Sequence, residues 1–114
     1  MKKMKLFLIC MFSVVMLNVS VATASITGSV GGLVPPDYRP CAFFSLVGVA
    51  EASTVKPGWP WFAIRQTQNG FKELYALLLS AKLTGTPVIV NATGVAVSEC
   101  DGYVGISNAY YYTP

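Results

Sequence analysis

The spacing of apolar residues predicts one helix in the second half of the chain. Apolar residues recur there at the i, i+3, i+4, i+7 positions that form one helical face, namely Phe71, Leu74, Tyr75, Leu78 and Ala81. Asn69 or Gly70 is suited to cap the start of this helix, and Gly85 is suited to end it. Glu73 in the first turn and Lys82 in the last turn each complement the helix dipole.

Three further leucines, Leu77, Leu79 and Leu83, widen the apolar arc of the helix. A helix that packs on a single sheet needs only one apolar stripe. Either this helix is buried on two sides, or its second face contacts another subunit.

Runs of β-branched and aromatic residues between Gly and Pro predict five strands. The first run, Ile26 to Val34, contains Gly28, Gly31 and Gly32, which indicates a strongly bent or bulged strand. The other strands are expected at Cys41 to Val49, Trp61 to Thr67, Pro87 to Ala92 and Tyr103 to Tyr112, with a loop at Glu51 to Pro60 and a turn centred on Gly94.

The predicted fold is mainly β with one helix, in the order β-β-β-α-β-β. This order is that of the OB-fold, a partly open barrel with a helix between its third and fourth strands. The pattern therefore predicts a five-stranded OB-fold-like barrel, formed by residues 25–114 as one domain.

Four short segments resemble the B subunits of subtilase-type and typhoid-type AB5 toxins, which are small exported bacterial proteins. They are Gly70-Phe71-Lys72-Glu73-Leu74, Thr84-Gly85, Val88-Ile89-Val90 and Tyr103-Val104-Gly105-Ile106-Ser107. The resemblance implies a secreted homopentamer or related ring that binds sialylated or other glycans through surface loops and associates with an enzymatic A subunit.

The chain departs from this family at the sugar-binding segment. Residues 28–33 stand where the family supplies Asp and Ser to a sugar, and they contain no matching pair. One expected disulfide also replaces the family's two. No sugar-binding residue is therefore transferred from the family to this sequence.

The first 24 residues have the three parts of a secretory signal peptide. A positive region with three lysines precedes the apolar run Leu6 to Val21, and Ala22-Thr23-Ala24 gives the small-x-small pattern of a cleavage site. A single membrane anchor is the alternative, because the run approaches the length that crosses a bilayer. Asn18 and the cleavage pattern disfavour it. We expect cleavage after Ala24, a secreted or periplasmic domain, and no membrane span in the mature chain.

Removal of the signal peptide balances the charge. The full chain has a net charge of +3 with eight basic and five acidic residues, and three of the eight are lysines of the signal peptide. Five basic residues then stand against five acidic ones. Nucleic acid requires clustered Lys and Arg, so it is not an expected partner.

Two cysteines, Cys41 and Cys100, remain after cleavage, since Cys10 leaves with the signal peptide. An exported chain reaches an oxidising compartment, where two such cysteines are expected to form a disulfide. The alternatives are a metal site and a catalytic thiol. The chain has no histidine, so both lack their usual companion residue. No metal and no cofactor are expected.

The same lack of histidine disfavours the common hydrolase sites, and we expect no enzymatic activity. Glu99 and Asp101 are close enough in the chain to suggest paired carboxylates. Adjacent acids in a loop are more often solvated turn residues, so we interpret them in that way.

Exposed aromatic residues are the remaining candidates for ligand contact. Trp59 lies between Gly58 and Pro60 in the expected loop, Trp61 begins the third predicted strand, and Tyr38 precedes the second. Each can stack on a sugar ring or a protein partner, or simply pack in the barrel. In the run Tyr110-Tyr111-Tyr112, alternate side chains face opposite sides of a strand.

Two functional hypotheses follow. The first is a B-subunit-like binding module for glycans, assembled as a homo-oligomeric ring with or without a companion protein subunit. The second is a monomeric periplasmic protein with a structural or inhibitory role, in which the same helix is simply core.

Overall fold

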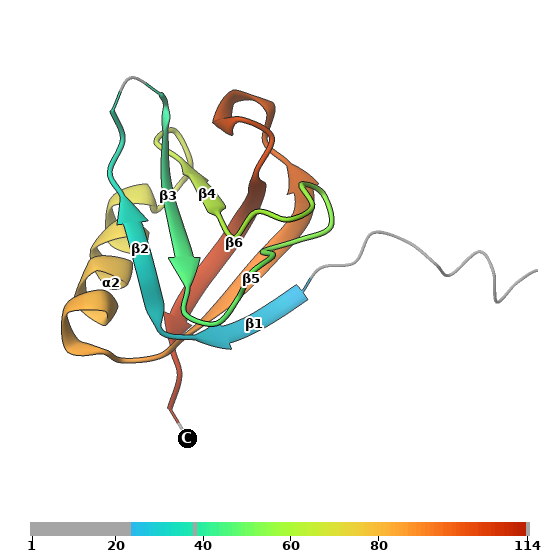
Figure 1. The fold of residues 1–114 in the computed structure, drawn as a ribbon. Helices are drawn as coiled ribbons and strands as arrows, with labels where there is room; N and C mark the ends of the chain where they lie inside the picture. Colours follow the sequence, from blue (N-terminus) through green and yellow to red (C-terminus); the bar gives the residue numbers. More distant parts are fainter. Residues whose placement is uncertain (1–23, 38, 114) are drawn as a thin grey trace, which may run out of the picture.

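The fold is a curved sheet of six strands with one long helix against its inner face (Figure 1). The computed structural model describes residues 24–37 and 39–113. Its elements are β1 (Ala24–Gly28), β2 (Val30–Val34), β3 (Cys41–Leu46), β4 (Phe62–Arg65), α2 (Phe71–Thr84), β5 (Val88–Ala96), the short 3-10 helix η1 (Ser98–Cys100) and β6 (Val104–Tyr111). The predicted signal peptide lies outside the described residues except for Ala24.

The strands lie in the order β1-β5-β6-β4-β3-β2. Neighbouring strands are antiparallel except for β4 and β6, which are parallel. The sheet is therefore mixed. Its two edge strands, β1 and β2, are consecutive in the chain and are separated only by Ser29.

The prediction of a five-stranded OB-fold-like barrel is confirmed only in part, because the fold is mainly β with one helix but its sheet is open and has six strands. The glycine-rich first run changes partner at Ser29, because β1 pairs with β5 whereas β2 pairs with β3. One predicted strand thus becomes two, and the element order becomes β-β-β-β-α-β-β. The two edges of the open sheet are joined by the chain at Ser29, whose carbonyl accepts a hydrogen bond from the Val47 N–H at 2.8 Å.

The prediction of the helix is confirmed. Gly70 caps its start and Gly85 its end, both with positive φ, and the N–H of Gly85 donates to the Ala81 carbonyl. Leu74 and Leu78 are buried against the sheet, as is Ala81. Leu79 and Leu83 remain 41% and 77% exposed, so the helix is not buried on two sides within one chain.

The main core fills the space between α2 and the inner face of the sheet. It includes Phe44 and Phe62, whose rings stack with centroids 5.0 Å apart, together with Ile64, Leu78 and Val90. These side chains are fully buried. Burial of this kind contributes about 1.5–3 kcal/mol for each large side chain, so this core is the principal source of stability.

A smaller core on the outer face surrounds a disulfide. Cys41 and Cys100 are bonded, as predicted, and both are fully buried with Phe43 and Ala63. The bond ties the start of β3 to the end of η1. Within the part of the chain that the structure describes, no helix has the length and apolar character to span a bilayer.

The C-terminal strands differ from the prediction in one respect. No turn forms at Gly94, because β5 continues through it to Ala96. Gly94 has a φ of 74° and lies where the pairing between β5 and β6 shifts register. The glycine marks an irregularity within a strand.

Candidate functional site

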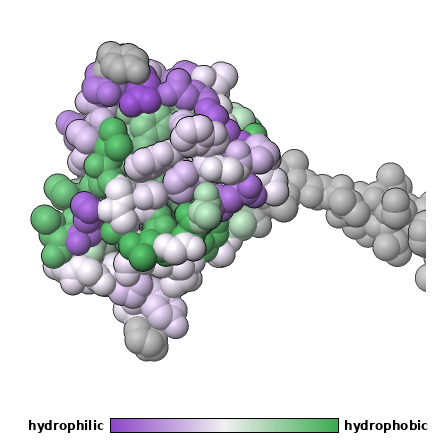
Figure 2. All heavy atoms as spheres, in the orientation of Figure 1, coloured by the Kyte–Doolittle hydropathy of each residue, from purple (hydrophilic) through white to green (hydrophobic). Residues whose placement is uncertain are grey.

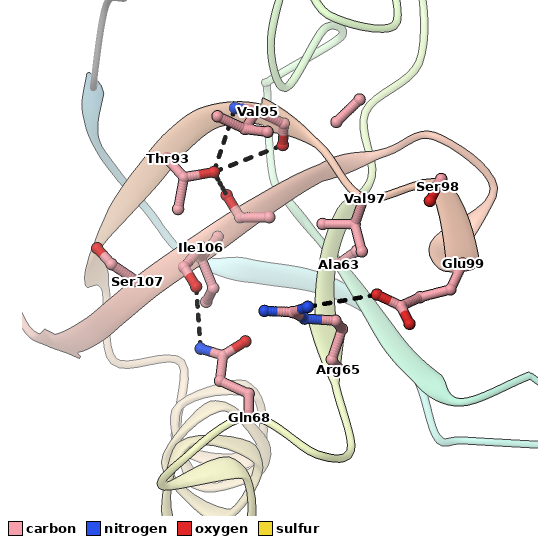
Figure 3. A pocket seen from close by; sticks show the side chains of 12 residues that line it. Ala63, Arg65, Gln68, Thr93, Val95, Val97, Ser98, Glu99, Ile106 and Ser107 are labelled. Carbon is pink, nitrogen blue, oxygen red and sulfur yellow. Dashed lines mark hydrogen bonds and ion pairs between the residues drawn. The ribbon is translucent and has the colours of Figure 1, made fainter.

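An open groove of about 560 Å³ crosses β4, β6 and β5 on the face of the sheet opposite α2 (Figure 3). We call it the main groove. Its polar side chains are Arg65, Gln68, Thr93, Ser98, Glu99 and Ser107. Its other residues are apolar or lack a side chain, namely Ala63, Val95, Ala96, Val97, Gly105 and Ile106. The volume lies within the range of about 300–1,000 Å³ that is usual for ligand sites.

Strand alternation explains why polar groups reach this face. In β4, Phe62 and Ile64 point into the main core, so Ala63 and Arg65 point to the outer face. In β5, Val90 and Ala92 are buried, and Thr93 follows on the outer side. A half-buried sheet is expected to show this pattern.

Arg65 and Glu99 form the charged end of the main groove. The guanidinium NH1 lies 3.3 Å from Oε1 of Glu99, and the two side chains are 49% and 50% exposed. Figure 3 shows them pointing towards one another across the groove. An exposed pair of this kind contributes about 0–1 kcal/mol to stability, so both groups keep hydrogen-bonding capacity for a ligand.

Hydrogen bonds to the backbone fix two other polar side chains. Gln68 Nε2 donates to the Ile106 carbonyl at 3.0 Å, which leaves the amide oxygen of Gln68 without a partner among the described residues. Thr93 Oγ1 donates to the Gly105 carbonyl at 3.1 Å and accepts from the Val95 N–H at 3.2 Å. These groups are therefore positioned before any ligand arrives.

An aromatic cluster occupies the neighbouring part of the outer face. We define it as Phe43, Trp59, Trp61 and Tyr103 with the ammonium of Lys56. Tyr103 packs edge-on against Phe43 and Trp59, with centroids 5.5 and 6.2 Å away, and Lys56 Nζ lies 3.9 Å from its ring centre. Such cation–π and aromatic contacts hold the loop that contains Trp59 against the sheet.

Arg39 lies at the rim of the aromatic cluster. Its guanidinium lies 4.6 Å from the Phe43 ring centre and bonds to Asp101 at 2.9 Å and to Asp37 at 3.3 Å. The side-chain hydrogen bond from Arg39 lowers the pKa of Asp37. Asp101 pairs with Arg39, whereas Glu99 pairs with Arg65.

The aromatic residues proposed from the sequence lie in different environments. Trp59 is 50% exposed, so its ring is accessible to a ligand. Trp61 is half-buried and packs on the smaller core. Tyr38 lies outside the described residues. Trp61 packs on the smaller core and Trp59 contacts Tyr103 at its edge, and of these two tryptophans Trp59 is the one with an exposed ring.

The polar residues of the main groove were not singled out by sequence reasoning. They come from β4, the turn after it, β5, η1 and β6, so no local motif connects them. The sequence signals nearest to the groove are Gly94 and Gly105, which lie at the irregular part of the β5–β6 pairing. A glycine within a strand often marks a bulge or a close approach.

No group of three or more metal-ligating side chains occurs among residues 24–37 and 39–113. The geometry of the main groove is that of a site for hydrogen bonding. No model of a protein family matches the chain, and neither a curated protein nor a solved structure shows significant similarity to it.

Proposed function

We propose that the chain is an exported, non-enzymatic binding module whose main groove binds a glycan. The observation that supports this proposal is the arrangement of polar side chains around an apolar floor. A sugar ring presents hydroxyl groups at its edge and C–H groups on its faces. The hydroxyl groups need hydrogen-bond donors and acceptors, and the C–H groups need apolar contact.

The main groove offers both kinds of partner in close proximity. Arg65 supplies N–H donors, and Glu99 and the Gln68 amide supply acceptor oxygens. The hydroxyl of Ser98 can do either, and that of Ser107, which donates to the Asn91 carbonyl, can accept. Val95, which is exposed, and the half-buried Val97 contribute apolar surface. Each ring hydroxyl is one donor with two lone pairs, which this mixture matches.

The proposal of export rests on the signal-peptide pattern and on the Cys41–Cys100 bond. A buried disulfide is compatible with an oxidising compartment. Cleavage after Ala24 would remove only the first residue of β1. Cell fractionation and mass measurement of the processed chain test this step, and a chain that retains residues 1–24 in a membrane fraction contradicts it.

We also propose that the module associates with copies of itself, in line with the resemblance to AB5 B subunits. The support is the second apolar face of α2, where Leu79 and Leu83 are exposed. Figure 2 shows hydrophobic residues gathered over α2 and the neighbouring β2. A companion subunit in the manner of an AB5 toxin would be a further partner of such an assembly.

A glycan array probed with the oxidised, processed domain tests the binding proposal. Arg65→Gln removes the groove's guanidinium, and Lys82→Gln, on the last turn of α2, is the matched control. Loss of a hydrogen bond to a charged group should weaken binding about tenfold or more in Arg65→Gln. Lys82→Gln should bind as the parent chain does.

The opposite result favours the monomeric structural or inhibitory role. A blank array from a domain that is folded and oxidised would exclude a glycan of the types printed. Equal binding by the parent chain and Arg65→Gln would show that the glycan binds outside the main groove. Trp59→Ala, run beside them, reports whether the aromatic cluster binds instead.

A further inference from the structure

The main groove continues beyond Ser107. A second hollow of about 370 Å³, which we call the side groove, shares Thr93 and Ser107 with it and extends towards β1. Ser25 and Asn91 supply the other polar side chains of the side groove. The two grooves form one trough across four neighbouring strands, β4, β6, β5 and β1.

A bulge in β6 lies at the junction of the two grooves. Asn91 stands opposite Asn108, and the next residue, Ala92, stands opposite Ile106, so Ser107 has no partner on β5. An extra residue of this kind interrupts the regular alternation of side chains between the two faces of the strand. Such bulges often lie next to functional sites. Ser107 Oγ donates to the Asn91 carbonyl at 3.2 Å, which holds the hydroxyl at the junction.

Gly105 forms part of the floor of the main groove and adds no side chain to it. Between the pairs Ala92–Ile106 and Ala96–Val104, three residues of β5 (93–95) stand opposite the single residue Gly105 of β6. A Cβ atom on Gly105 would lie 2.9 Å from Cγ2 of Val97, closer than side-chain packing permits. Thr93 and Ser107 line both grooves, so the two hollows adjoin one another at these residues.

A row of cross-strand hydrogen bonds lines the far half of the trough. Ser25 Oγ donates to Asn91 Oδ1 at 2.6 Å, and Asn91 Nδ2 donates to Asn108 Oδ1 at 2.5 Å. The three residues are direct neighbours on β1, β5 and β6. The amide of Asn91 is thus held in one orientation, and its oxygen keeps a further lone pair for a ligand hydroxyl.

We propose that the ligand of the trough is an oligosaccharide of at least two rings that lies across all four strands. Neighbouring strands lie about 4.8 Å apart, so the trough extends over about 14 Å from β4 to β1. Its chemistry changes along this length, because Arg65 and Glu99 form an ion pair at the β4 end, whereas the β1 end has the hydroxyl of Ser25 and the amide of Asn91 and, after cleavage at Ala24, the α-amino group of Ser25. This inference rests on the proposed function and adds the length and placement of the ligand.

The experiment compares glycans of one type and increasing length. The array prints galactose-, glucose-, N-acetylglucosamine- and mannose-terminated glycans, each as a mono-, di- and tetrasaccharide, and titration calorimetry follows every series that binds. Within a series, we expect the tetrasaccharide to bind at least tenfold more tightly than the monosaccharide.

Two variants locate the gain in affinity. Asn91→Ala acts only in the side groove, and Gln68→Ala only in the main groove. Asn91→Ala should weaken tetrasaccharide binding about fivefold and leave monosaccharide binding unchanged, whereas Gln68→Ala should weaken both. Ser25→Ala, which removes one exposed hydroxyl, replaces Asn91→Ala if thermal unfolding shows that the latter is not folded.

Each outcome decides between the two proposals. Equal affinity for every length, with no effect of Asn91→Ala or Ser25→Ala, would overturn the extended ligand and leave glycan binding in the main groove intact. Absence of binding in all four series would overturn both.

Discussion

Gly32 lies directly beneath the indole ring of Trp61. A Cβ atom on Gly32 would lie 2.9 Å from Cη2 and 3.1 Å from Cζ3 of Trp61, and 3.1 Å from Oγ of Ser45. The N–H of Gly32 also donates to this Oγ at 2.9 Å. The missing side chain of Gly32 thus lets Trp61 cover β2 and close one side of the smaller core.

This relationship predicts that Gly32→Ala destabilises the fold. The added methyl group must displace the indole ring or the strand, and overpacking of this kind costs about 1–3 kcal/mol. Gly31→Ala is the matched control on the same strand, because its nearest contacts would be an ordinary 3.4 Å. Urea unfolding should give a lower free energy for Gly32→Ala than for Gly31→Ala; equal values would show that the indole does not pack there.

Removal of the disulfide should cost much of the stability of this small domain. The bond closes a loop with a sequence separation of 59, and chain-entropy reasoning gives about 4 kcal/mol for a loop of this size. The double variant Cys41→Ala/Cys100→Ala should therefore unfold at a markedly lower urea concentration than the oxidised parent. The reduced parent is the control, and it should behave as the double variant does. A midpoint unchanged by both treatments would contradict the prediction.

The two tryptophans should contribute unequally to the stability of the fold. Trp61 packs on the smaller core, so Trp61→Ala should lower the free energy of unfolding by about 2–4 kcal/mol. Trp59 is half exposed, and Trp59→Ala should cost less than about 1 kcal/mol. Thermal and urea unfolding of the two variants measure the difference. A larger loss in Trp59→Ala would mean that its loop supports the fold more than the exposed ring indicates.

The exposed face of α2 should control self-association. Leu83 is 77% exposed, so Leu83→Lys should dissociate an assembly that uses this face while leaving the monomer folded. Ser80→Lys adds the same charge at another exposed position of α2 and is the control. Light scattering after size exclusion should give an oligomer for the parent chain and a monomer for Leu83→Lys. A parent chain that is monomeric at micromolar concentration would contradict ring assembly.

Acid should weaken the contact between Arg39 and Asp37. The pKa of Asp37 is lowered in the folded chain by hydrogen bonds from Arg39, so this contribution to stability is present above the ordinary pKa of 3.8 and is lost as the pH falls through the lowered value. Asp37→Asn should therefore reduce the pH dependence of unfolding below pH 3.8. An identical pH profile for the variant and the parent would exclude the contact in solution.

Much of the architecture could be predicted because it depends on local patterns. The helical spacing between Phe71 and Ala81 and the glycine at position 85 define α2 within a few residues of the observed bounds. The pairing of Cys41 with Cys100 was expected, because these are the two cysteines that the predicted cleavage leaves. The bend in the first run was expected from its glycines, although the change of strand partner at Ser29 was not.

The candidate site could not be predicted, because its residues meet only through strand pairing. Arg65 and Glu99 are 34 positions apart, and Gln68 and Ile106 are 38 apart, yet each pair is in contact. Ser107 reaches the trough through a shift of register, to which only the nearby glycines Gly94 and Gly105 point in the sequence.

The sequence by itself determined the helix, the approximate strands and the disulfide of this protein. Side-chain periodicity depends on neighbouring residues, and two remaining cysteines allow one pairing. Only the tertiary structure decided that the sheet is open with six strands, that α2 leaves two leucines exposed, and that a polar trough crosses four strands. The physical reason is that strand pairing and register depend on contacts between segments distant in the chain, and these contacts form together as the core packs.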